Sequence, residues 1–154
     1  MFSDDVTHHT FNRFVASSMN TTPQRRLTLQ ELDGTFAVCR LAQDSTIPSW
    51  ATSDKFFSIT RTRDELSIVC AASQVPNDVR SESDWRCLRV VGSMAFTEVG
   101  VLASLVAPLA AAGISVFAIS TFDTDYLLVK AKDWQATLAK LKLVGHEVLG
   151  EAVA

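Results

Sequence analysis

Regular hydrophobic patterns begin only after the first 24 residues of the chain. Residues 1–24 are polar, rich in Ser and Thr, and follow no sustained period of two or 3.6 residues. A segment of this kind buries too little apolar surface to fold, so we predict a disordered N-terminal arm. Met19, inside this arm, is an equally good candidate for the biological start.

The strongest pattern is a strand followed by an amphipathic helix. Residues 85–91 are rich in β-forming side chains and end at Gly92, which predicts a strand. The helix that follows is expected to end at Gly113, because glycine is the preferred C-cap. Its apolar positions recur at helical spacing and are Val99, Leu102, Val106 and Leu109.

Two residues define the expected shape of this helix. Thr97 is the expected N-cap, because its side-chain oxygen can accept a hydrogen bond from an amide of the first turn. Pro108 lies well inside the helix and has no backbone N–H to donate. We therefore expect Pro108 to bend the helix axis without breaking the helix.

A hairpin, a second helix and a last strand follow. Residues 114–121 and 126–131 alternate in polarity and predict two strands joined by a turn at 122–125. Residues 133–145 begin with an aspartate cap, end at a glycine, and predict a helix, and residues 146–149 predict a short strand. One face of this helix is expected to carry Trp134, Leu138 and Leu141. The order of elements is βαββαβ.

This order restricts the topology. If both crossovers are right-handed, the strands form an antiparallel sheet in the spatial order 4-1-3-2, with both helices on one face. This is the ferredoxin-like plan of an α+β protein. It brings the end of the first strand, the amino end of the first helix and the turn at 122–125 to one edge of the sheet.

The first half of the chain repeats this pattern in shortened form. Residues 57–71 match residues 117–131 at an offset of 60, which aligns Glu65 with Asp125. The first helix of this half is reduced to about residues 48–52, and residues 27–32 are expected to supply the edge strand that it otherwise lacks. We therefore predict two ferredoxin-like modules, a degenerate one at 25–84 and a complete one at 85–154.

Composition and charge exclude several classes of protein. The formal net charge of −3 gives no electrostatic reason to expect nucleic acid or anionic lipid as the main partner. No run of about 18 apolar residues predicts a membrane span, and no secretory signal pattern opens the chain. Three cysteines lie in apolar runs without a CxxC motif, which is typical of reduced thiols and predicts a cytoplasmic protein: Cys39, Cys70 and Cys87.

Neither catalysis nor RNA binding finds support in the residues. An enzyme needs a base, a nucleophile or a metal constellation, yet His146 is the one histidine after the arm, and no metal-ligand spacing occurs. We expect His146 to be structural or solvent-exposed, and we expect no catalytic residue, metal or cofactor. An RNA-recognition motif shares the βαββαβ order, but residues 126–131 lack the glycine and aromatics of its stacking surface.

Several segments together resemble a known family, the small tandem ACT-domain proteins, which are similar to the CASTOR-like amino-acid sensors. The resemblance covers residues 27–149, and the stretch 117–129 is its most specific part. It implies a pair of ACT modules that bind an amino acid or similar small metabolite and regulate another process without catalysis. The segments that carry it are residues 47–51, 60–69, 85–92, 96–103 and 118–129.

The residues of the second module are compatible with such a ligand site. A helix amino end presents free N–H groups that suit a carboxylate, and Asp123 with Asp125 could accept hydrogen bonds from an ammonium or guanidinium group. Both aspartates could equally satisfy turn amides. The candidate ligand-binding residues are Gly92, Ser93, Thr97, Glu98, Val99, Gly100, Thr121, Phe122, Asp123 and Asp125.

The resemblance also implies an assembly. The chain is similar to half of a larger four-module sensor, so we predict a homodimer with the loop at 92–100 facing the partner subunit and the ligand near that interface. The alternative function is a dimerisation module that binds no ligand, because edge strands and apolar helices of small modules often pair across chains.

Overall fold

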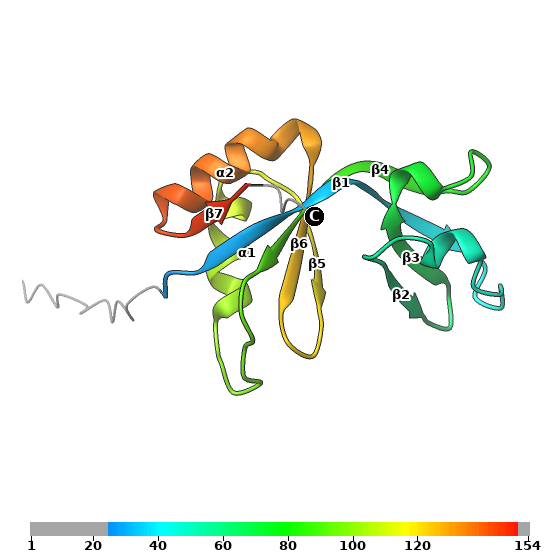
Figure 1. Ribbon diagram of the computed structural model, residues 1–154, viewed down its shortest axis with the longest axis horizontal. Helices are drawn as coiled ribbons and strands as arrows, with labels where there is room; N and C mark the ends of the chain where they lie inside the picture. Colours follow the sequence, from blue (N-terminus) through cyan, green and yellow to red (C-terminus); the bar gives the residue numbers. More distant parts are fainter. Residues whose placement is uncertain (1–24, 151–154) are drawn as a thin grey trace, which may run out of the picture.

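The computed structural model describes residues 25–150, so the predicted disorder of residues 1–24 falls outside the described residues. Seven strands, two α-helices and three 3-10 helices follow one another along this part of the chain (Figure 1). In order they are β1 Thr28–Leu41, η1 Ser49–Thr52, β2 Ser58–Arg61, β3 Leu66–Ala71, η2 Ala72–Gln74, β4 Ser81–Val90, α1 Val101–Ala111, β5 Val116–Ser120, β6 Asp125–Lys130, η3 Ala131–Asp133, α2 Trp134–Leu143 and β7 Glu147–Leu149.

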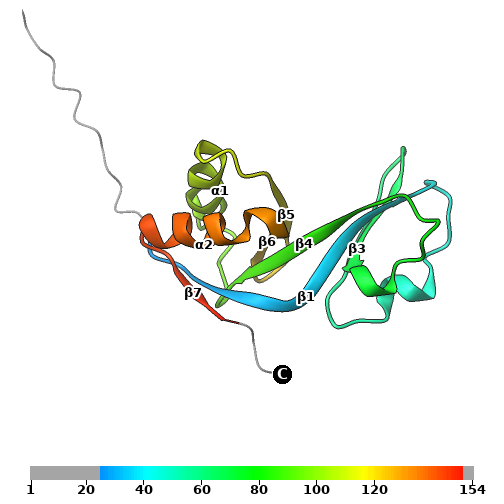
Figure 2. The same cartoon turned by 90° about the horizontal axis from the view of Figure 1, so that it is seen from above.

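All strands belong to one strongly twisted sheet that joins two halves of the molecule. The sheet has the order β2-β3-β1-β4-β6-β5, and β7 pairs with β1 outside this path. Strands β1 and β4 run from one half into the other, so that β2 and β3 lie at one end while α1, α2 and the remaining strands lie at the opposite end (Figures 1 and 2). The fold is α+β and comprises two ferredoxin-like modules, the first with a shortened first helix. No helix within residues 25–150 is long and apolar enough to cross a membrane.

The first residues of β1 have a different neighbour from the one predicted. They do not complete the first module: Leu29 pairs with Val90 of β4 on one side and with Val148 of β7 on the other. The last strand therefore lies next to β1, and the predicted 4-1-3-2 order of the second module is wrong at this position. The edge strand of the first module is instead the beginning of β4, where Ser81 pairs with Cys39.

A bulge allows β1 to serve both modules. The pairing of β1 with β4 shifts in register between Leu32 and Phe36, and Gly34 inside this interval has a φ of +84°. Bulges of this kind bend a strand and increase its twist, and a positive φ favours glycine. Leu29 before the bulge can therefore pack in the core of the second module while Cys39 after it packs in the core of the first.

The second module has a core on each face of its sheet. Helices α1 and α2 cover one face, whose core contains Leu29, Leu88, Val90, Val101, Leu105, Leu109, Ile114, Leu127, Val129, Trp134 and Leu141. The predicted face of α2 is confirmed for Trp134 and Leu141, which are buried, and Leu138 packs against them. On the opposite face Phe56 of the first module lies against Tyr126, with ring centroids 4.7 Å apart.

The two hairpins show that the predicted repeat is misaligned by one residue. Arg61 pairs with Leu66 as the last pair before one turn, and Ser120 pairs with Asp125 as the last pair before the other. Leu66, and not Glu65, therefore takes the position of Asp125. Because side chains alternate between faces, the one-residue difference moves Glu65 into the turn and puts a buried leucine where the second module has a carboxylate.

Pro108 in α1 is compensated by a histidine. Pro108 has no N–H to donate to the carbonyl of Ser104, its normal partner in the helix. Nε2 of His146 lies 3.3 Å from that carbonyl oxygen, and Nδ1 of the same ring accepts a hydrogen bond from the N–H of Leu27 at 3.2 Å. His146 is 3% exposed, so of the two predicted roles the structural one is correct. Because Nδ1 accepts the N–H of Leu27, Nε2 is the nitrogen that can donate to the carbonyl of Ser104.

Candidate functional site

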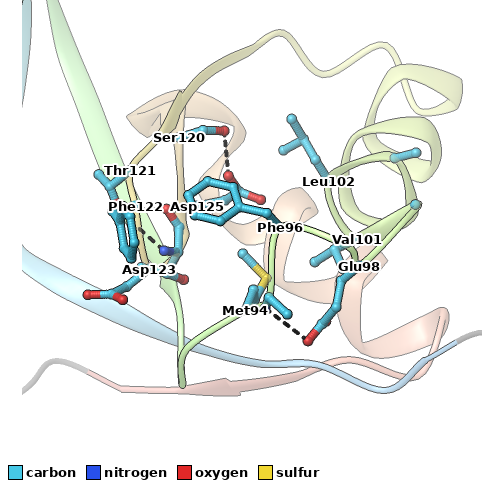
Figure 3. Close-up of a pocket in the computed structure, with 14 residues that line it drawn as sticks. Met94, Phe96, Glu98, Val101, Leu102, Ser120, Thr121, Phe122, Asp123 and Asp125 are labelled. Carbon is cyan, nitrogen blue, oxygen red and sulfur yellow. Dashed lines mark hydrogen bonds between the residues drawn. The ribbon is translucent and has the colours of Figure 1, made fainter.

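The candidate site is a cavity of about 330 Å³ between the amino end of α1 and the turn that joins β5 to β6. Figure 3 shows its side chains converging from the segment before α1, from α1 itself and from the turn. Its lining consists of Met94, Ala95, Phe96, Glu98, Gly100, Val101, Leu102, Ala103, Ser120, Thr121, Phe122, Asp123, Thr124 and Asp125.

The turn at 121–124 is held by threonine side chains. Thr121 donates its N–H to the carbonyl of Thr124 at 2.9 Å, and its hydroxyl oxygen accepts the N–H of Thr124 at 3.2 Å. The hydroxyl of Thr124 donates to the carbonyl of Val90 at 2.7 Å, which attaches the turn to the end of β4. Phe122 and Asp123 are left at the tip of the turn. The turn amide is thus satisfied by a threonine rather than by a nearby aspartate.

Asp125 is the most buried carboxylate of the cavity, at 9% exposure. It is the first residue of β6, and its Oδ1 accepts a hydrogen bond from the Ser120 hydroxyl at 2.5 Å. This short contact orients the carboxylate in the cavity wall (Figure 3). Within residues 25–150 this is the hydrogen bond found for the Asp125 side chain, so Oδ2 remains available to a ligand.

Helix α1 begins three residues later than the predicted N-cap implies. Its N-cap is Gly100, in the left-handed region at φ +81°, and no side chain caps the helix. Thr97 is therefore not the N-cap, because the chain enters the helix through a left-handed conformation that favours glycine, three residues later. The amides of Val101, Leu102 and Ala103 form the uncapped first turn, and all three residues line the cavity. They give the cavity hydrogen-bond donors with a partial positive charge.

Glu98 takes part in two contacts within the chain. Its Oε1 accepts the N–H of Ala95 at 3.3 Å, and its Oε2 forms an ion pair with the guanidinium of Arg25. The first contact closes the segment before α1 into a turn, together with a hydrogen bond from the N–H of Glu98 to the carbonyl of Ala95. Both carboxylate oxygens of Glu98 are thus occupied in this structure.

Two exposed aromatic rings meet at the cavity. Phe96 and Phe122 are each 78% exposed, yet their rings contact each other edge to face with centroids 4.9 Å apart (Figure 3). A further contact joins the same two segments, because the N–H of Met94 donates to the carbonyl of Asp123 at 2.8 Å. The two rings therefore form an apolar rim of the cavity.

The structure brings six of the ten predicted site residues into the lining of this cavity: Glu98, Gly100, Thr121, Phe122, Asp123 and Asp125. Gly92, Ser93, Thr97 and Val99 lie outside the lining. Ser93 is nonetheless close, with its hydroxyl 3.5 Å from Oδ1 of Asp123. Val99 is 95% exposed and precedes α1, so it is not part of the predicted apolar helix face.

Sequence reasoning missed part of the lining, namely Met94, Ala95, Phe96, Val101, Leu102, Ala103, Ser120 and Thr124. Ser120 could have been found, because a short turn places the last residue of β5 opposite the first residue of β6. Phe96 offered no periodic signal. No group of three or more possible metal ligands occurs within residues 25–150, and the three cysteines lie outside the cavity.

The pKa values with a resolved shift belong to these buried cysteines. Burial raises the pKa of Cys87 to about 12. Hydrogen bonding between Cys39 and Cys70 raises the pKa of Cys39 and lowers that of Cys70. All three are free thiols in the interior of the sheet.

Two family models and a solved structure match this chain. A family model described as ACT domain matches residues 80–142, and a model described as an N-terminal domain matches residues 34–78. A crystal structure of a protein from Agobacterium tumefaciens is 43% identical, covers 83% of this chain and 96% of its own, and superposes with a TM-score of 0.79.

Two further proteins are similar over part of their length. The human cytosolic arginine sensor for mTORC1 subunit 1 is 38% identical over 96 residues, which are 57% of this chain and 28% of the sensor. The chain thus spans about a quarter of that relative. Aspartate kinase from Clostridium acetobutylicum is 9% identical with a TM-score of 0.55, covering 77% of this chain and 34% of the kinase, and shares the fold alone. The family model thus assigns residues 80–142 of the chain to the ACT-domain family.

Proposed function

We propose that this chain is a non-catalytic regulatory protein that binds an amino acid in the cavity between α1 and the β5–β6 turn. One observation carries the proposal: a buried carboxylate, Asp125, and the uncapped amino end of α1 line the same cavity. An amino acid offers the complementary pair, an ammonium group for Asp125 and a carboxylate for the amides of residues 101–103. A cavity of about 330 Å³ lies in the size range of small-molecule sites.

The charges of the lining favour a ligand with a second positive group. Glu98, Asp123 and Asp125 are acidic, and no Arg, Lys or His is found among the fourteen described residues that line the cavity. One α-ammonium group balances one carboxylate, so a cationic side chain would complement another. The human relative is named a cytosolic arginine sensor, which makes arginine the first amino acid to test.

Calorimetry with an Asp125→Asn variant tests the site. Loss of a charge-assisted hydrogen bond amounts to about 1.5 to 3 kcal/mol, so affinity should fall roughly ten-fold to more than a hundred-fold. The fold should survive, because the asparagine oxygen can still accept the Ser120 hydroxyl. A screen of the twenty amino acids by thermal shift supplies the ligand, which should stabilise the protein by about 2.7 kcal/mol at a hundred times its Kd.

Glu65→Gln is the matched control. Glu65 ends the corresponding turn of the first module and pairs with Arg40 at 3.0 Å, away from the cavity. This variant should bind the amino acid as the unmodified chain does. Unchanged affinity of Asp125→Asn, together with lower stability of the free protein, would show that Asp125 is a structural residue and that the ligand binds elsewhere.

We also propose that two copies associate through the loop at 92–100, and one observation favours this surface. Val99 is 95% exposed and belongs to the same loop as the exposed Phe96, whose ring contacts the exposed ring of Phe122, so this surface offers apolar area to a partner. A twofold contact would bring two equivalent cavities to the interface. The same surface would serve a dimerisation module without ligand, the alternative function.

Light scattering of a Val99→Glu variant tests the association. The variant should shift the protein toward monomer at tens of micromolar, because a charge would be buried in the contact. Leu143→Glu is the control, since Leu143 is similarly exposed but lies at the end of α2. A monomer for the unmodified chain, with and without amino acid, would exclude the dimer. A dimer that binds none of the twenty amino acids would favour the alternative function.

A further inference from the structure

Arg25 brings a positive charge to the candidate site from a distant part of the sequence. It lies just before β1, 73 residues from Glu98, and its guanidinium pairs with Oε2 of Glu98. Glu98 lines the cavity, whereas Arg25 does not. The chain itself thus supplies a cation to one of the three carboxylates that line the cavity.

The surroundings of the two partners differ in a way that favours exchange. The Arg25 side chain is 59% exposed and the Glu98 side chain 24% exposed. The Arg25 guanidinium can therefore leave the pair and become fully hydrated. Its departure would leave the less hydrated carboxylate of Glu98 without a cation, unless a ligand supplies one. A ligand cation that reaches Glu98 would replace Arg25 without changing the number of ion pairs.

The backbone next to Arg25 is anchored, so the exchange would be confined to its side chain. The N–H of Leu27 donates to Nδ1 of the buried His146, and the N–H of Val91 donates to the carbonyl of Thr28 at 2.8 Å. These bonds hold the beginning of β1 within reach of the segment before α1. Release of the guanidinium would leave β1 in place.

We propose that Arg25 is an internal competitor for the positively charged side chain of the ligand. This inference rests on the proposed amino-acid site and adds a specificity element to it. An amino acid with a cationic side chain must displace Arg25 from Glu98, whereas one with a neutral side chain leaves the pair intact. Arg25 therefore lowers the affinity for cationic amino acids selectively and is released when one of them binds.

Calorimetry with an Arg25→Gln variant and a matched ligand pair tests the proposal. L-Lysine carries a side-chain ammonium group that L-norleucine lacks, and L-citrulline has a neutral ureido group in place of the guanidinium of L-arginine. An exposed ion pair contributes about 0.2 to 1 kcal/mol, so Arg25→Gln should bind lysine and arginine about 1.5- to 5-fold more tightly. Affinity for norleucine and citrulline should not change.

Arg26→Gln is the matched control. Arg26 is the next residue, and its guanidinium pairs with Glu147 at 3.8 Å, away from the cavity. This variant removes the same charge from the same segment and should bind all four ligands as the unmodified chain does. An equal gain in Arg26→Gln would mean that net charge, and not competition at Glu98, sets the affinity, and would overturn the proposal.

Three other outcomes would each overturn the proposed competition. Weaker binding of both members of each ligand pair to Arg25→Gln would identify Arg25 as a support for the loop and overturn competition. Equal affinity of Arg25→Gln and the unmodified chain for lysine and arginine would overturn competition while leaving the proposed function intact. If the unmodified chain binds none of the twenty amino acids, the proposed function fails first, and the inference fails with it.

Discussion

The hydrogen-bond chain through His146 leads to a quantitative prediction about stability. His146 serves two backbone groups at once, the carbonyl of Ser104 that Pro108 leaves unbonded and the N–H of Leu27. It thereby connects α1, the turn before β7 and the beginning of β1. Replacing His146 with Ala leaves both groups without a partner in a buried site.

The magnitude follows from the number of groups affected. A buried polar group left unsatisfied costs about 1 to 3 kcal/mol, so two such groups predict a loss of roughly 2 to 6 kcal/mol for His146→Ala. In a Pro108→Ala background the new alanine has an N–H that can donate to Ser104, and one of the two losses disappears. The loss caused by His146→Ala should therefore be about 1 to 3 kcal/mol smaller in that background.

Urea denaturation of the four proteins of this cycle measures the coupling. Midpoints and m-values give the free energy of unfolding of the unmodified chain, His146→Ala, Pro108→Ala and the double variant. Contacting residues should deviate from additivity by more than the 0.3 to 0.5 kcal/mol typical of independent sites. Additivity within that limit would refute the argument, because it would mean that His146 does not replace the hydrogen bond that Pro108 cannot make.

Two further predictions concern a thiol and a glycine. The pKa of Cys87 in the folded protein, about 12, lies above the ordinary value of 9.0. The contribution of the buried, protonated thiol to the free energy of unfolding is therefore complete below pH 9 and is lost as pH rises toward 12. Stability should fall by up to about 1.4 kcal/mol per pH unit in this interval, and Cys87→Ala, measured by denaturation at several pH values, should lose that part of the slope. Gly100→Ala should lower the free energy of unfolding by about 1 to 2 kcal/mol, because a Cβ is disfavoured at φ +81° even though no atom lies within 4 Å of it. Thermal unfolding of Gly150→Ala, at a glycine without positive φ, provides its control.

Local patterns in the sequence were sufficient for the elements of the second module. Alternation over residues 114–131 predicts the hairpin that β5 and β6 form, and helical spacing predicts that Trp134 and Leu141 face the core. The turn between β5 and β6 was recognised as a site because its carboxylates follow a strand in a known plan. These features depend on neighbours within about one turn or one hairpin, where the period of the side chains fixes which face is buried.

Contacts between distant segments were decided by the tertiary structure. Residues 27–32 were expected to form an edge strand, but the sequence does not fix its partners, since the hydrogen bonds of a strand edge fit a neighbour in either module. Burial of Leu29 under the two helices selects the second module, where β1 pairs with the end of β4 and with β7. The predicted alignment of the repeat was wrong by one residue for a related reason. Similar residues can be aligned at two offsets, and only the register of the paired strands assigns Leu66 to the position of Asp125. The pair of Arg25 with Glu98 has no local signature at all: it exists because β1 begins beside the segment that enters α1, and that proximity arises only when the sheet is complete.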